Sequence, residues 1–367
     1  MAEFFYEYGL FFLKALTFVI AIIVIIMAVV AAAMRGRGAE GGSSSGHVEI
    51  KKYNENLQDM QEALSFSLME PLQRKQAEKE KKASEKADKK AAKQAAKKAK
   101  KQRGDGETIV PEVARPRVYV MDFDGDIRAS EVEKLRREIT AILTTATPED
   151  EVVIRLESGG GMVTSYGLAA SQLDRIRDKK VPLTVCVDKV AASGGYMMAC
   201  VADKLVAAPF AVLGSIGVVA QIPNFHRLLK KFDIDFEMLT AGKYKRTLTV
   251  FGENTDEGRE KFIEDIERIH GQFKDYVSKR RPELDIEAVA TGEIWSGQDT
   301  LDMKLADMLS TSDQYLTDSC EEKDVLMISY KARKKLMERL SLAVQNTIDA
   351  VLLKWLDRLL QSRFNIG

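Results

Sequence analysis

The sequence predicts an α/β fold with at least some parallel strands, attached to an N-terminal transmembrane helix. From residue 117 onwards, short runs rich in β-branched residues alternate with amphipathic helical stretches, and glycine clusters interrupt this alternation. The uncharged residues 15–34 predict the membrane helix, because about 20 apolar residues are needed to cross a bilayer.

Residues 15–34 are rich in Ile, Val and Ala. A secretory signal peptide is the competing interpretation, but its apolar region usually has only about 7–15 residues, and the acidic Glu3 and Glu7 precede this one. Arg35, Arg37 and a Gly/Ser-rich run follow directly, which disfavours a buried core helix. Residues 1–37 are therefore predicted to form a retained single-pass anchor.

Residues 74–103 form a strongly basic segment with fourteen Lys or Arg and four acidic residues, whereas the whole chain has a net charge of zero. The segment has few large apolar side chains, so it cannot form a core. It lacks aromatic residues that stack on bases, so we favour a solvated linker or contact with lipid headgroups, and expect no nucleic acid. Residues 38–115 are interpreted as a linker and basic low-complexity region.

The globular domain is predicted over residues 116–320. Strands are expected at residues 117–123, 151–156, 181–187 and 236–240, and as two short strands within 204–219, broken at Pro209 and Gly214. Helices are expected at residues 130–145, 161–179, 194–201 and 256–279. This alternation is typical of βα units and a parallel sheet.

Residues 321–367 are assigned to a C-terminal amphipathic helix. Within residues 331–363 large apolar side chains recur at spacings of three and four, with many Lys and Arg between them. We expect this helix to pack on its own domain or on a neighbouring subunit, with the membrane interface as the second choice.

The three cysteines Cys186, Cys200 and Cys320 show no metal-ligand spacing, and we expect neither metal nor cofactor. Cys186 and Cys200 stand in apolar surroundings and are interpreted as small buried hydrophobic residues.

Ser193 is the first candidate for chemistry, in the run Ala192-Ser193-Gly194-Gly195-Tyr196. It follows an apolar strand and precedes an apolar helix, so its hydroxyl is expected near free backbone N–H groups that favour an oxyanion. A second glycine cluster at residues 157–161 also joins a strand to a helix. It lacks the Gly-Lys-Ser/Thr ending of a phosphate loop and the spacing of a dinucleotide fingerprint. Two donor loops suit acyl transfer.

The general base is harder to find, because the three histidines have poor settings. His47 lies in the linker, His226 beside a basic run and His270 on a charged helix, and we interpret all three as solvated. Lysine can replace histidine if burial lowers its pKa from about 10.4 toward 7 or 8. Lys243 and Lys245 are the candidates, and their spacing does not choose between them, because residues two apart in an extended chain share a face.

Four motifs in order give the chain a resemblance to the signal peptide peptidase A family of Ser/Lys peptidases. The resemblance covers nearly the whole chain, including the anchor, and rests on Ala192-Ser193-Gly194-Gly195-Tyr196, Gly214-Ser215-Ile216-Gly217-Val218, Gly242-Lys243-Tyr244-Lys245 and Trp295-Ser296-Gly297-Gln298. It implies that Ser193 is the nucleophile and Lys245 the general base. It also implies that Ser215 orients the lysine amine, and that Gly160 and Gly194 supply oxyanion donors.

The resemblance further implies a ClpP/crotonase-like ββα spiral core and a ring of identical protomers in which the serine of one meets the lysine of the next. One position departs from the family, whose glycine loop usually reads Ser-Pro-Gly-Gly, whereas this chain has Gly159 in place of the proline. If the serine and the lysine of one site come from different protomers, an isolated protomer would be inactive. Gly159 in place of the proline would make the glycine loop less rigid.

The expected function is that of a serine endopeptidase of the bacterial inner membrane that cleaves short apolar peptides, such as signal-peptide remnants, through an acyl-enzyme. A crotonase-like acyl-CoA enzyme is the second hypothesis, for which Glu157 would be the catalytic carboxylate, and a non-catalytic membrane scaffold is the third. The positive residues after the anchor favour a cytoplasmic C-terminus, whereas the family resemblance favours the opposite face, so the side stays open.

Overall fold

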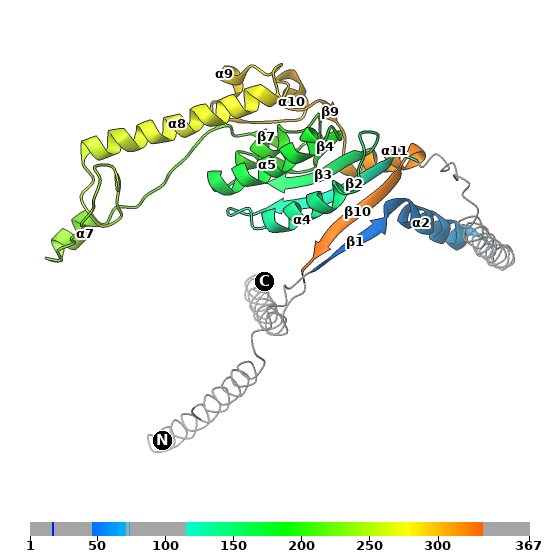
Figure 1. Ribbon diagram of the computed structural model, residues 1–367, viewed down its shortest axis with the longest axis horizontal. Helices are drawn as coiled ribbons and strands as arrows, with labels where there is room; N and C mark the ends of the chain where they lie inside the picture. Colours follow the sequence, from blue (N-terminus) through cyan, green and yellow to red (C-terminus); the bar gives the residue numbers. More distant parts are fainter. Residues whose placement is uncertain (1–16, 18–45, 71–72, 74–114, 333–367) are drawn as a thin grey trace, which may run out of the picture. The chain divides into compact units, whose positions relative to one another are not determined.

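The computed structural model describes residues 17, 46–70, 73 and 115–332. The chain divides into two compact units, and the unit Val48–Lys331 holds the sheet and nearly all described residues (Figure 1). The predicted anchor, the basic segment 74–103 and nearly all of the predicted helix 331–363 lie outside the described residues. Within the described ranges, no helix has both the length and the apolar character needed to span a bilayer.

A ten-stranded sheet forms the core, with a main path β1-β10-β2-β3-β4-β6-β9. The strands of this path are β1 (His47–Lys52), β10 (Asp324–Lys331), β2 (Arg117–Gly125), β3 (Glu151–Ser158), β4 (Leu183–Val187), β6 (Lys204–Ala207) and β9 (Met308–Leu309). From β10 to β9 every neighbouring pair is parallel. The prediction of an α/β fold with parallel strands is confirmed.

Helices cover the sheet on both faces, as parallel sheets require. Along β2, Tyr119, Met121 and Phe123 join the larger apolar cluster, whereas Val118 and Val120 join a smaller one that includes Leu316. This alternation follows from the two-residue period of a strand. The larger cluster includes residues of α4 (Val132–Ile142), α5 (Val163–Asp178) and α6 (Gly194–Ala199), and the smaller one residues of α11 (Ser312–Glu322).

A short second set of strands branches from the end of β3. β5 (Val190–Ala192) pairs in parallel with β3 and with β7 (Val212–Gly214), and β8 (Ile294–Ser296) runs antiparallel to β7. The chain leaves β5 and β7 at neighbouring points, so the residues that follow these two strands are brought together.

The long helix α8 (Asp256–Arg280) crosses above these elements (Figure 1). Thr255 caps its N-terminus, since the Thr255 side chain accepts a hydrogen bond from the Gly258 N–H, and the first turn has two acidic residues. Its only buried residues are Phe273 and Val277, so its C-terminal half packs on the core. The remaining helices of the described residues are α2 (Tyr53–Leu68), α7 (His226–Lys231), α9 (Ile286–Val289) and α10 (Gln298–Asp302).

The predicted strand at residues 236–240 is wrong, because this stretch has no regular structure. The backbone of a strand needs a neighbouring strand to satisfy its N–H and C=O groups, and none of the described sheet pairings reaches this stretch. Leu239 is 94% exposed, and Phe236 packs only locally, with its ring centre 5.8 Å from that of Phe251.

The sheet extends beyond the predicted 116–320 domain at both ends. β10 lies within the stretch assigned to the C-terminal helix, and β1 and α2 lie within the stretch assigned to the linker. Asn54 ties these parts together: its side chain accepts from the Val325 N–H at 2.7 Å and donates to the carbonyls of Cys320 and Lys323. The residues that these bonds join are more than 260 positions apart in sequence, so local sequence patterns do not reveal the bonds.

Candidate active site

The register of β5 and β7 places Ser193 beside Ser215. Ala192 pairs with Gly214, so the next residue of each strand lies at the same end of the ladder, about one strand spacing of 4.8 Å apart. The Ser193 N–H donates to the Gly214 carbonyl at 2.8 Å, which continues the pairing beyond the strands. Two of the serines selected from the sequence are thus neighbours in the fold.

Ser193 occupies a strained turn between β5 and α6. Its φ of 52° and ψ of −118° lie in a region that residues with a side chain rarely adopt. Its carbonyl accepts from the Met197 N–H at 3.0 Å, which fixes the start of the helix. Strain of this kind needs support from the surrounding structure, and it concentrates at functional sites.

Ser215 also has a positive φ, of 50°, and is held from the other side by the residue that precedes β8. Its N–H donates to the Glu293 carbonyl at 2.6 Å. The ring of Trp295 covers Gly214 so closely that an added Cβ would lie 2.6 Å from the indole. The Trp295-Ser296-Gly297-Gln298 motif therefore contributes by fixing the turn that carries Ser215.

The two glycine loops touch each other at Gly160. Its φ is 89°, and a Cβ there would lie 2.7 Å from the Gly194 nitrogen and 2.8 Å from the Ser193 Cβ, so only glycine fits. The Gly160 N–H donates to the Ser158 Oγ at 3.0 Å. An amide has one hydrogen, so this N–H is not available to an oxyanion while that bond is kept.

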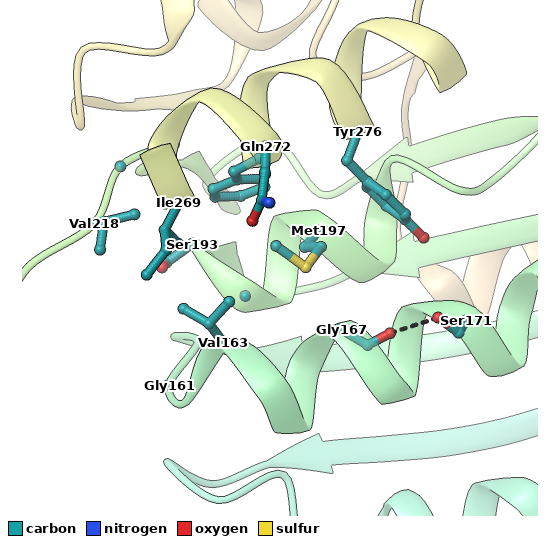
Figure 2. A pocket seen from close by; sticks show the side chains of 13 residues that line it. Gly161, Val163, Gly167, Ser171, Ser193, Met197, Val218, Ile269, Gln272 and Tyr276 are labelled. Carbon is teal, nitrogen blue, oxygen red and sulfur yellow. Dashed lines mark hydrogen bonds between the residues drawn. The ribbon is translucent and has the colours of Figure 1, made fainter. Parts of the chain in front are cut away.

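A cavity of about 350 Å³ opens beside Ser193, between α5, α6 and α8. Figure 2 shows Ser193 with Val163, Met197 and Ile269 around one opening, and Gln272 and Tyr276 descending from α8. Gly161 and Gly194 also line the cavity, and no hydrogen bond among the described residues uses either N–H. The site offers a hydroxyl, two backbone donors and an apolar recess.

Lys245 does not join Ser193 within one protomer. Its neighbours hold it at the first turns of α8, since Lys243 pairs with Glu257 at 2.6 Å and the Lys261 amine lies 5.7 Å from the centre of the Tyr244 ring. The cavity begins at Ile269, which is about 12 to 18 Å further along the helix at 1.5 Å per residue. Lys245 is exposed, and no hydrogen bond among the described residues joins it to either serine.

The electrostatics disfavour one of the two candidate lysines, Lys243. The hydrogen bond to Glu257 raises the pKa of Lys243, which keeps its amine protonated. A general base needs the opposite shift, so Lys243 is poorly suited to the role.

None of the other titratable candidates forms a hydrogen bond with Ser193 among the described residues. His270 is half-buried, and its Nε2 lies 3.3 Å from the Ile216 carbonyl, so the expectation that it is solvated is wrong. Cys186 and Cys200 are buried, and burial raises the pKa of each thiol to about 12, which confirms their interpretation as inert hydrophobic residues.

Sequence reasoning missed the contribution of α8 to the cavity and of Ser158 and Tyr166 beneath the glycine loops. The apolar spacing of Ile269, Phe273 and Val277 was a possible signal, because it marks a helix face that packs inward. No local pattern distinguishes Ser158 or Tyr166 from ordinary strand and helix residues.

Comparison with known proteins assigns the class. Residues 3–173 match the model of the N-terminal region of peptidase family S49, and residues 175–326 match that of peptidase family S49 itself. The chain belongs to peptidase family S49, and is a serine peptidase of this Ser/Lys dyad family.

Within the family, the chain is similar to "Probable protease SohB" of Haemophilus influenzae, with 50% identity over 333 residues that cover 90% of each chain. It is 54% identical over 240 residues to the protein of the same name from Buchnera aphidicola, covering 65% of this chain and 71% of the relative. Among solved structures it matches 1510-N, a membrane-bound stomatin-specific protease in complex with a substrate peptide, with 14% identity and a TM-score of 0.39, covering 62% of this chain and 99% of the other.

Proposed function

We propose that this chain is a membrane-anchored endopeptidase in which Ser193 forms an acyl-enzyme with the substrate. The observation that carries the proposal is the strained Ser193 turn, which touches the second glycine loop at Gly160 and opens onto an apolar cavity. The Ser193 oxygen attacks the peptide carbonyl, and Lys245 accepts the hydroxyl proton and passes it to the leaving amine. Water, activated by the same lysine, then releases the acyl group and regenerates the serine.

The base comes from a neighbouring protomer in this proposal. Residues 219–251, which include Lys245, form a segment with many large exposed apolar side chains: Val219, Ile222, Phe225, Leu228, Phe232, Ile234, Phe236, Met238, Leu239, Tyr244 and Phe251. Exposed apolar surface on this scale is typical of a protein interface. In a ring of identical protomers, a neighbouring copy would cover this apolar segment. The Lys245 of each protomer would then lie at the Ser193 and Ser215 of a neighbour, so that each active site is shared by two protomers.

The oxyanion donors are the N–H of Gly194 and one N–H of the loop 159–161. Gly160 was expected to be the second donor, but its N–H is directed at Ser158, whereas Gly161 lines the cavity together with Ser193. We therefore assign the second donor to Gly161. A tetrahedral intermediate would place its negative oxygen between these two amides.

The proposed substrates are short apolar peptides close to the bilayer, such as signal-peptide remnants. The apolar side chains in the cavity lining support this, because burial against them is unfavourable for a charged side chain; they are Val163, Met197, Val218, Ile269 and Phe273. The proposed anchor at residues 1–37 would hold the enzyme in the bacterial inner membrane in a single pass. The branch of β5, β7 and β8 from β3 supports a core of the ClpP/crotonase type.

The crotonase-like alternative has less support. Its candidate carboxylate, Glu157, is held in an ion pair with Lys189 at 2.9 Å and is absent from the lining of the cavity beside Ser193.

A fluorophosphonate probe tests the nucleophile directly. The full chain in detergent should be labelled at Ser193, as located by mass spectrometry of the labelled peptide. Labelling that persists in Ser193→Ala would overturn the assignment.

A further inference from the structure

Ser158 and Tyr166 form a buried hydroxyl pair beneath the two glycine loops. Ser158 is the last residue of β3 and is 2% exposed, and Tyr166 is the fourth residue of α5 and is fully buried. Their oxygens are 2.6 Å apart. Neither side chain reaches the cavity lining, so neither contacts the substrate.

Counting protons gives the pair a direction. The Tyr166 hydroxyl has one hydrogen, which it donates to the Asp126 carbonyl at 2.7 Å, so the Ser158 hydroxyl must donate to the Tyr166 oxygen. The Ser158 oxygen is then the acceptor for the Gly160 N–H at 3.0 Å. Burial raises the pKa of Tyr166, which keeps its proton in place. The bonds run one way, from the Gly160 N–H to the Asp126 carbonyl in the turn after β2, and hydrogen bonds in such a chain strengthen one another.

The same two residues also pack under the other glycine loop. A Cβ at Gly194 would lie 2.4 Å from the Tyr166 Cγ, and one at Gly195 would lie 2.4 Å from the Ser158 carbonyl oxygen. The N-terminus of α6, with the Gly194 N–H, therefore rests directly on the pair. One buried pair thus contacts the backbone of both donor loops.

We infer that Ser158 and Tyr166 are positioning residues that set the direction of the two oxyanion donors. The hydrogen bond to Ser158 fixes the peptide that ends at Gly160, and the next peptide carries the N–H of Gly161. Gly159, Gly160 and Gly161 have no side chains to restrict them, so the orientation of the loop depends on backbone contacts: the bond to Ser158, the packing of Gly161 on Ile127, and the Met162 N–H to the Ile127 carbonyl at 2.8 Å. The inference rests on the proposed role of Ser193.

The test compares Ser158→Ala and Tyr166→Phe in the full chain in detergent. The reaction is hydrolysis of a fluorogenic peptide amide with an apolar residue before the scissile bond. Removing an oxyanion donor costs about 10²–10³ in kcat, so a misdirected donor should cost about 10- to 100-fold in Ser158→Ala, with KM within about two-fold. Tyr166→Phe should cost less, because the Ser158 hydroxyl can turn to the Gly125 carbonyl at 3.3 Å.

A peptide boronate supplies the second measurement, because its tetrahedral adduct uses the oxyanion donors. Its inhibition constant should weaken by the same factor as kcat falls. Tyr315→Phe is the matched control: it removes a half-buried tyrosine hydroxyl that bonds Glu151 at 2.5 Å, remote from the cavity. It should lower the melting temperature and leave kcat within about two-fold of the wild type.

The inference is overturned if Ser158→Ala changes kcat and boronate affinity no more than Tyr315→Phe does. It is also overturned if KM rises while kcat is kept. Ser193→Ala distinguishes failure of this inference from failure of the proposed function. If Ser193→Ala keeps full turnover, Ser193 is not the nucleophile.

Discussion

Ser193 and Ser215 both follow strand ends with a positive φ, and the fold supports each through backbone partners. The carbonyls of Gly214 and Glu293 accept their N–H groups at 2.8 and 2.6 Å. A positive φ strains the backbone of a residue that has a side chain, so it needs support from the surrounding structure. These two hydrogen bonds supply that support and keep both serines at the C-terminal ends of β5 and β7.

Lys245→Ala should abolish turnover, whereas Lys243→Ala should not. Loss of a general base costs about 10²–10⁴ in rate, and Lys243, whose pKa its partner Glu257 raises, should change kcat by less than about two-fold. Steady-state kinetics on the two variants, prepared alike, make the comparison. Equal losses of kcat in the two variants would show that the segment 219–251 supports activity through its structure, and that Lys245 is not the general base.

Glu138 should make stability depend on pH. It is fully buried, and desolvation raises its pKa, although its Oε1 accepts the Tyr330 N–H at 2.7 Å. Since the folded pKa lies above the unfolded one, the folded state binds more protons between them, and stability falls as pH rises through this window. Glu138→Gln should therefore melt at a higher temperature than the wild type at pH 8 and at a similar temperature at pH 4.

Differential scanning fluorimetry at both pH values checks this prediction. Glu133→Gln on the exposed side of the same helix is the control, and should show no such pH dependence. A wild-type advantage at pH 8 would contradict the prediction.

At the scale of elements, α5, α6 and α8 surround the cavity, and glycine keeps it open. Gly167 lies on α5 and lines the cavity, and a Cβ added there meets nothing within 4 Å. Gly167→Leu should fill the recess without strain in the helix, because leucine is the better helix former.

The expected result for Gly167→Leu is a loss of about 10- to 200-fold in kcat/KM for peptides with a large apolar residue at the cavity, and a smaller loss for alanine. Gly271→Ala on α8 is the control, since its added Cβ also meets nothing and Gly271 does not line the cavity. An equal loss for all peptides would show that the cavity does not select the substrate.

At the scale of the whole molecule, the separation of Lys245 from Ser193 predicts shared active sites. Ser193→Ala and Lys245→Ala should each be inactive alone, and should recover activity when mixed, because one protomer supplies the serine and the other the lysine. Mixing after dissociation and reassembly in detergent, with peptide hydrolysis as the readout, measures the recovery. If both variants assemble together and no activity returns, each protomer must complete its own site.

The α/β class, the order of the central elements and the two serine-bearing turns followed from local sequence. Strand and helix periods are local, and the glycines around Ser193 mark a turn by their own conformational freedom. The prediction of a strand at residues 236–240 was wrong because a strand forms only where another strand pairs with it.

Tertiary structure alone decided which residues meet. The sequence by itself determined the α/β core and marked Ser193, Ser215 and Lys245. The pairing of Ala192 with Gly214 joined the two serines, and the length of α8 kept the lysine away. The Ser158 and Tyr166 pair and the cavity beneath α8 also emerged only in the fold, because they depend on contacts between segments far apart in the chain, which no local period encodes.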